Sequence, residues 1–281
     1  MLYRAGAILN QKVEANDGIV GVVKDLYFDD VAWTLRYLVV DTGGWLTGSD
    51  VLISSEAVVE FNQERSTLVT RLSQLQIENS PPADKGQPVS RLNEMQLSQY
   101  YGWSPYWTAP NGLFPWSKTY TFPRHPSVPD GGPTSPNFEA EFERQSQTDP
   151  NLRSFVSLKN YGLRAADGDI GQVEDLLIEP ESWRITHMIV DARLWWPGGL
   201  VAIDRGMIED IMWSDHKIVV AMTRKQVEDA PAYSKEGALD EDYQTQLSTY
   251  YQTLQPTYQT PGATDTSRHS WAGQQSGFQN I

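Results

Sequence analysis

The chain has 281 residues, enough for two domains of ordinary size with connecting segments. It contains no cysteine, which excludes disulfides, thiolate metal sites and cysteine nucleophiles and fits a reducing compartment. Its net charge of −14 argues against direct binding to nucleic acid, because neutralising phosphates requires clustered lysine and arginine.

The first 80 residues predict short strands joined by tight turns. Asn16-Asp17-Gly18 is typical of a hairpin turn, which needs positive φ. Gly21 lies inside the next strand and indicates a bulge or a tight bend that lets a small sheet curl. Apolar and polar residues alternate in Trp33–Asp41, so we expect a strand whose first residue is Trp33.

The rest of this unit continues the same pattern. We expect a second turn at Trp45–Gly48, a short strand at Val51–Ile53, a hairpin of Val58–Phe61 with Leu68–Val69, and a helical turn at Ser73–Ile77 that Ser73 can N-cap. About six short strands at close spacing predict a small closed or nearly closed barrel over residues 1–80.

Between residues 81 and 151 the composition changes to proline, glycine, serine and aromatic residues. Arg91–Tyr101 predicts a short helix with Ser90 as its N-cap. The aromatic residues that follow are costly to leave in water, so we expect them to lie on a surface, either of this chain or of a partner. Residues 126–148 have the composition of a flexible linker.

Residues 152–232 repeat the first unit at an offset of 150 positions without a gap. Between Asp17 and Pro81, 17 of 65 positions are identical to their counterparts. Unrelated sequences match at about one position in fifteen or twenty. The repeat extends to Tyr100 and Tyr101, which recur as Tyr250 and Tyr251. Duplication therefore predicts a second barrel at 152–232 and a short helical segment at 233–251. Glutamine, threonine, serine and glycine dominate residues 252–281, which predicts a disordered tail.

Both copies carry the pattern DG-x-x-G-x-V-x-D-Leu, a Trp-led strand ending in Val-Asp, and Trp and Gly before Val-x-Ile. This combination resembles the PRC-barrel domain, a family named for the cytoplasmic part of the photosynthetic reaction-centre H subunit. It is also similar to the C-terminal domain of a bacterial ribosome maturation factor. The resemblance implies a mainly β chain of two tandem barrels that dock within larger assemblies. Without the H subunit's transmembrane helix, we do not expect direct membership of a photosynthetic complex.

Acids that recur in both copies are the candidates for chemistry: Asp25 and Asp175, with Asp41 and Asp191. They fit a general acid–base pair or a cation site, or short acids that cap turns at strand ends, and we favour the capping role. The histidines share no ligand spacing, and we find no phosphate-binding loop or nucleophile elbow. We therefore expect no catalytic, cofactor-binding or metal-binding residue, and a protein that is not an enzyme.

We expect a protein-interaction or scaffold protein that docks to a larger membrane-associated or photosynthetic-type complex. Its candidate contacts are aromatic: Tyr100, Tyr101, Trp103, Trp107, Trp195 and Trp196. The recurring Trp33 and Trp183 fit either packing at a barrel rim or stacking on sugars or bases.

The two barrels are expected to pack on each other with pseudo-two-fold symmetry. No stretch reaches the ~20 apolar residues of a membrane span and the N-terminus does not resemble a signal peptide, so we expect a cytoplasmic protein that meets membranes only through a partner. Two alternatives remain: an RNA- or ribosome-linked assembly factor, and a divalent-metal-dependent enzyme that uses the duplicated aspartates.

Overall fold

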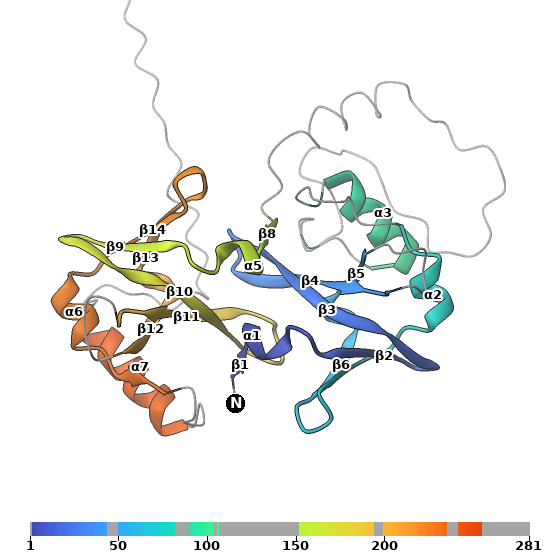
Figure 1. The fold of residues 1–281 in the computed structure, drawn as a ribbon, viewed down its shortest axis with the longest axis horizontal. Helices are drawn as coiled ribbons and strands as arrows, with labels where there is room; N and C mark the ends of the chain where they lie inside the picture. Colours follow the sequence, from blue (N-terminus) through green and yellow to red (C-terminus); the bar gives the residue numbers. More distant parts are fainter. Residues whose placement is uncertain are drawn as a thin grey trace, which may run out of the picture.

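Two curled β-sheets with short helices make up this mainly β protein, and they lie side by side along its long axis (Figure 1). The computed structural model describes residues 2–43, 50–81, 89, 91–103, 106, 152–193, 199–234 and 241–254. Among these residues, no helix combines the length and the apolar character that a membrane span requires.

The first sheet has the strand order β5-β4-β3-β2-β7-β6. Its strands are β2 (Lys12–Ala15), β3 (Gly18–Asp29), β4 (Thr34–Asp41), β5 (Asp50–Ser54), β6 (Val58–Asn62) and β7 (Thr67–Thr70). Strands β2 and β7 run parallel, and the other neighbours run antiparallel. The short helix η1 (Ser55–Ala57) joins β5 to β6, and α2 (Gln74–Glu78) follows β7.

The second sheet repeats this order as β12-β11-β10-β9-β14-β13. Its strands are β9 (Gly162–Ala165), β10 (Gly168–Ile178), β11 (Ile185–Asp191), β12 (Leu200–Asp204), β13 (Ile208–Met212) and β14 (Lys217–Val220). Its short helices are η2 (Arg205–Met207), η3 (Trp213–Asp215) and α6 (Arg224–Glu228). One further strand, β15 (Ala232–Tyr233), pairs with the free side of β12.

The bend predicted at Gly21 comes from a close backbone approach. A side chain there would place its Cβ 2.1 Å from the carbonyl oxygen of Asp41, and at Gly171 the corresponding distance to Asp191 is 2.0 Å. The ladder between β2 and β3 shifts register beside this point, between Val13 and Glu14. Only glycine lets the long strand pass this close to the end of its neighbour, so the sheet can curl.

The helical turn after β7 is closed by the predicted cap. Ser73 and Gln76 form a reciprocal capping box at the start of α2, and Thr223 and Gln226 form the same box at α6. Two orphan backbone N–H groups are satisfied at each helix, which holds these five-residue helices in place.

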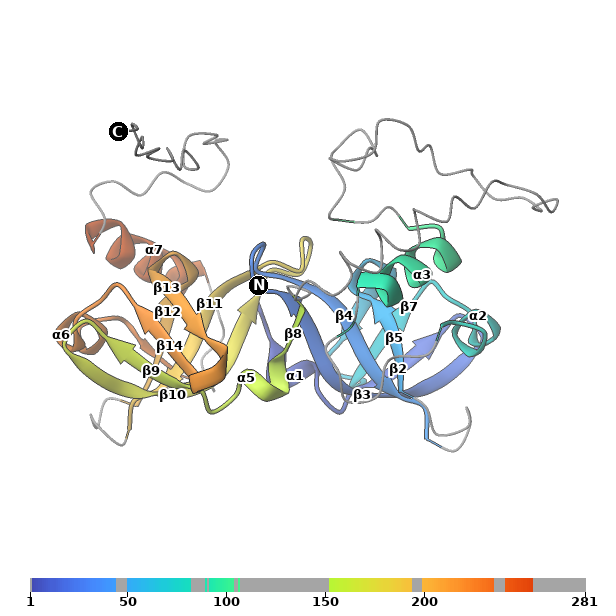
Figure 2. The same ribbon diagram turned by 90° about the horizontal axis from the view of Figure 1, so that it is seen from above.

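A longer helix lies over each sheet, α3 (Arg91–Tyr101) over the first and α7 (Glu241–Leu254) over the second (Figure 2). The outer face of the first sheet packs under α3 in a small apolar cluster that includes Tyr37, Leu52 and Leu97. Helix α7 extends to Leu254, so residues 252–254 are helical, whereas we expected a disordered tail from residue 252. Residues 255–281 lie outside the described part. The predicted linker at 126–148 also lies outside it.

The alternating pattern predicted that Trp33 is the first residue of a strand, and this prediction is wrong. Strand β4 begins at Thr34, and Trp33 has a left-handed backbone with φ of 52° in the turn before it. Trp183 has φ of 56° in the matching turn before β11. An alternating pattern does not register a change of backbone handedness, so it placed the strand start one residue early.

The two units exchange their N-terminal arms. The first arm, β1 (Tyr3–Arg4) and α1 (Ala5–Ile8), reaches across so that β1 pairs with β10 of the second sheet. The second arm, β8 (Leu152–Ser154) and α5 (Phe155–Leu158), does the reverse and pairs with β3. Both arms lie in the middle of the molecule (Figure 1), and one apolar core runs through the two units.

Candidate functional site

The seam between the two units is built from equivalent residues. The N–H of Leu35 donates to the carbonyl of Trp183 at 2.9 Å, and the N–H of Ile185 donates to the carbonyl of Trp33 at 2.7 Å. Thr34 and Arg184 form a β-bridge between these two bonds. Each pair is related by the 150-position offset, so the interface is isologous, as in a two-fold dimer.

Asp25 and Asp175 hold the exchanged arms. Asp25 accepts hydrogen bonds from the backbone N–H of Val156 at 3.0 Å and from the hydroxyl of Ser154. Asp175 accepts one from the N–H of Gly6 at 2.8 Å. Burial raises the pKa of both carboxyls, and these hydrogen bonds counteract that rise.

The other duplicated acids act locally. Asp41 accepts the N–H of Gly43 at 2.8 Å, and Asp191 accepts the N–H of Arg193 at 3.0 Å. These are turn caps of the kind that short acids form at strand ends. Within the described residues, no group of three or more histidine, aspartate or glutamate side chains is placed to hold a metal ion.

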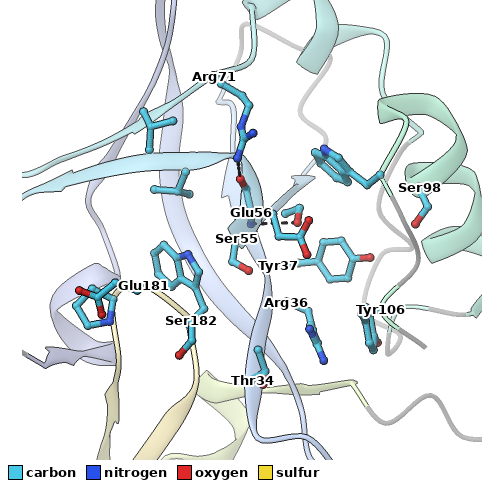
Figure 3. Close-up of a pocket in the computed structure, with 16 residues that line it drawn as sticks. Thr34, Arg36, Tyr37, Ser55, Glu56, Arg71, Ser98, Tyr106, Glu181 and Ser182 are labelled. Atoms are coloured by element: carbon cyan, nitrogen blue, oxygen red, sulfur yellow. Dashed lines mark hydrogen bonds between the residues drawn. The ribbon is translucent and has the colours of Figure 1, made fainter. Parts of the chain in front are cut away.

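A groove of about 590 Å³ opens at the junction of the two units (Figure 3). Its walls come from β4, the β5–η1–β6 region, the end of α3 and the turn between β10 and β11. The lining residues are Thr34, Arg36, Tyr37, Ser54, Ser55, Glu56, Val58, Val59, Arg71, Ser98, Trp103, Tyr106, Pro180, Glu181, Ser182 and Trp183. Both units contribute, so the groove depends on the exchanged arms that join them.

Two arginines of the groove are held by different contacts. The Arg36 guanidinium lies 3.8 Å from the centre of the Tyr106 ring and 3.4 Å from a carboxylate oxygen of Asp29. The Arg71 guanidinium donates to the backbone carbonyl of Glu56, as the dashed line in Figure 3 marks. Arg36 is therefore paired with an acid, whereas Arg71 forms no ion pair with another residue that the structure describes.

A buried carboxyl lies behind the groove wall. The Glu94 side chain in α3 is 0% exposed, and it accepts hydrogen bonds of 2.8 Å from Arg91 and from the Tyr106 hydroxyl. Burial raises the pKa of Glu94 to about 7, against the favourable charge of Arg91 and the Tyr106 hydrogen bond. Burial also raises the pKa of Tyr37 on the strand below.

In the second unit a histidine takes the place of Tyr37. His187 lies on β11, and its ring Nε2 is 3.8 Å from a carboxylate oxygen of Asp204. Burial lowers the pKa of His187, and Asp204 acts against that shift. Next to His187, the Tyr251 hydroxyl donates to the carbonyl of Ala202 at 2.7 Å.

The predicted contact residues fall in three places. Tyr100 is 40% exposed, and its hydroxyl donates to the carbonyl of Gln76 at 2.9 Å, while Tyr250 makes the same bond to Gln226. Tyr101 is half-buried and stacks on Trp103, with ring centres 4.2 Å apart. The remaining candidates, Trp107, Trp195 and Trp196, lie outside the described residues. A partner-contact role for these aromatics stays a prediction.

Sequence reasoning missed the polar side chains of the groove and the carboxyl behind it. Arg36, Glu56, Arg71 and Glu94 belong to no spacing motif and come together only through the fold. All four positions differ between the copies, but most positions of the repeat do, so the difference does not single them out. Their counterparts are Thr186, Gly206, Ala221 and Gln244.

Comparison with known proteins gives one family. Residues 2–74 match the family model described as the PRC-barrel domain, which spans the first arm, the first sheet and the start of α2. No curated protein matches the chain. The family resemblance noted in the sequence is thus confirmed for the first unit.

Proposed function

Because the first unit of this chain is a PRC-barrel domain, we propose that the protein is a non-enzymatic scaffold made of two PRC barrels that hold protein partners in a larger assembly. The family match carries this proposal, since a PRC-barrel domain indicates a protein-interaction role. The second unit is included because it repeats the strand order of the first at the 150-position offset.

The joint between the units supports a scaffold. Each arm is hydrogen-bonded into the other sheet, and the apolar core is continuous across the seam. Separating the barrels would expose apolar surface and break the bonds of both arms at once. Partner-binding faces on the two barrels are therefore held at a fixed relative position, which is what a scaffold requires.

The duplicated aspartates support a non-enzymatic role. Asp25 and Asp175 each accept a backbone N–H group of an exchanged arm, so each has a structural contact across the seam. A general base or a cation ligand needs lone pairs directed at a substrate or an ion. Their hydrogen bonds to the arms give these carboxylates a structural role, and this supports a protein that is not an enzyme.

Affinity capture of the tagged full-length protein from its native cells tests the proposal, with both the soluble and the detergent-solubilised membrane fractions analysed by mass spectrometry. A Tyr100→Ala variant removes the exposed aromatic of α3, and Tyr250→Ala is its matched control 150 positions later in α7. We expect wild type to capture a reproducible set of partners. The Tyr100→Ala variant should capture less of them, and the Tyr250→Ala variant should capture as much as wild type.

Three results would count against the scaffold. The first is the absence of any reproducible partner in either fraction. The second is co-sedimentation with ribosomal subunits, which would favour an assembly factor. The third is turnover of a substrate that is lost in Asp175→Ala, which would favour an enzyme.

A further inference from the structure

The groove at the junction is large enough for several side chains of a partner. Its volume of about 590 Å³ lies in the range of 300–1,000 Å³ that is typical of ligand sites. Glu56 and Arg71 border it from the first unit, and Glu181 and Trp183 border it from the second (Figure 3 labels all but Trp183). Any occupant would therefore contact both units.

The side chains of the groove are those that dominate protein–protein contacts. Trp103, Trp183, Tyr106 and Arg36 line it, and tryptophan, tyrosine and arginine are the residue types most enriched at binding hot spots. Serine and threonine hydroxyls line the same walls, which makes the groove too polar for a purely apolar ligand. A polypeptide can satisfy both kinds of surface with its backbone and its side chains.

The charge of the groove favours a cationic occupant. The positive charge of Arg36 is offset by Asp29, which leaves Arg71 against the carboxylates of Glu56 and Glu181. Both glutamates are exposed, and neither forms an ion pair with another residue that the structure describes. The two arginines and two glutamates of the lining balance, and Asp29, paired with Arg36 behind the lining, adds one negative charge. In a chain of net charge −14, this balance disfavours an anionic ligand.

The second unit reaches the same strand order without these residues. Glu56, Arg71 and Trp103 correspond to Gly206, Ala221 and Thr253, yet the second sheet has the same strand order. Glu181 likewise corresponds to Val31 in the turn between β3 and β4. A requirement of the fold itself would apply to both units. The first groove therefore carries side chains that are available for recognition.

We infer that this groove binds an extended segment of a protein partner through its lysine or arginine side chains, which the two glutamates attract while Trp103 and Trp183 contact the segment. The inference rests on the proposed scaffold function for the class of partner, a protein. Glu56 and Glu181 set the charge preference, one from each unit.

Fluorescence polarisation with defined peptides tests it on the full-length chain. Three labelled nine-residue probes alternate serine with lysine, glutamine or glutamate. We expect the lysine peptide to bind most tightly and the glutamate peptide not to bind. The double variant Glu56→Gln/Glu181→Gln should weaken the lysine peptide about five-fold, as the loss of two exposed ion pairs implies.

A matched variant separates groove binding from general attraction to an acidic protein. Glu209→Gln/Asp210→Asn removes the same two charges from exposed positions on β13 of the second unit. We expect it to leave the affinity for the lysine peptide within two-fold of wild type. Equal weakening by both double variants would overturn the inference, and so would equal binding of the three peptides or a preference for neutral oligosaccharides.

The same variants distinguish this inference from the scaffold itself. Capture of identical partners by wild type and by Glu56→Gln/Glu181→Gln, together with no peptide preference, would remove the groove and leave the scaffold in place. Specific peptide binding without any captured cellular partner would support the groove and count against the scaffold.

Discussion

Asp25 and Val156 are 131 residues apart in the chain, yet the carboxylate of one accepts the backbone N–H of the other at 3.0 Å. The same bond recurs on the other side of the seam, where Asp175 accepts the N–H of Gly6 at 2.8 Å. The two acids are equivalent because each unit receives an arm from the other unit. Their duplication thus reflects a two-fold interface inside a single chain.

Asp25→Ala and Asp175→Ala should each destabilise the chain by about 1–3 kcal/mol, because the arm's N–H group would be left without its partner in a partly buried site. Urea unfolding of the full-length protein measures the loss. Asp41→Ala is the control. Asp41 caps an exposed turn, so its loss should lower the free energy of unfolding by less. Equal losses for the seam and turn positions would contradict the arm-holding role.

Gly21→Ala and Gly171→Ala should each cost at least about 2 kcal/mol, because the new Cβ would overlap a backbone carbonyl and force the strands apart. The overlap distances are 2.1 and 2.0 Å. Gly162→Ala on β9 is the matched control, since the nearest atoms to its Cβ would be 4.0 Å away. Thermal unfolding should show a large drop for the first two variants and little change for the third.

Glu94 should make the first unit less stable as the pH rises. Its pKa of about 7 in the folded chain lies above its ordinary value of 4.5, so folding favours the protonated form. The stability contributed by this proton is fully present below pH 4.5 and is lost as the pH rises through 7. The total change is about 3 kcal/mol. The charged or titratable groups that face Glu94 are Arg91, Tyr106, Asp29, Arg36 and Tyr37.

Glu94→Gln tests this dependence, and the second unit already carries Gln244 at the equivalent position. Relative to wild type, the variant should gain stability as the pH is raised from 5.5 to 8.5, because an amide does not ionise. Hydrogen exchange of α3 amides across this range would locate the effect in the helix. If the difference in stability between the variant and wild type were the same at every pH, Glu94 would be excluded as the source of the pH dependence.

Mg²⁺ or Ca²⁺ at millimolar concentration should leave the melting temperature unchanged, because the duplicated acids are separated and occupied by backbone donors. The measurement is a thermal shift with and without chelator. A concentration-dependent rise that disappears in Asp25→Ala or Asp175→Ala would revive the metal-dependent alternative.

The sequence by itself determined the local structure and the family. The capping boxes at Ser73 and Thr223, the hairpin turn at Asp17-Gly18 and the tight bends at Gly21 and Gly171 follow from residue types that only certain backbones accept. The 150-position repeat predicted two similar units, and their shared strand order agrees with it.

Only the tertiary structure decided how the units meet. Alternation cannot reveal that Trp33 leaves the strand with a left-handed backbone, nor that residues 3–4 add to a sheet more than 170 positions away. Pairing between distant strands depends on which edge is free and which apolar surface remains to be covered, and neither is encoded in a short window. For the same reason the groove residues are scattered in the sequence: Arg36, Glu56 and Arg71 come together when the first unit folds, and Glu181 joins them where the two units meet.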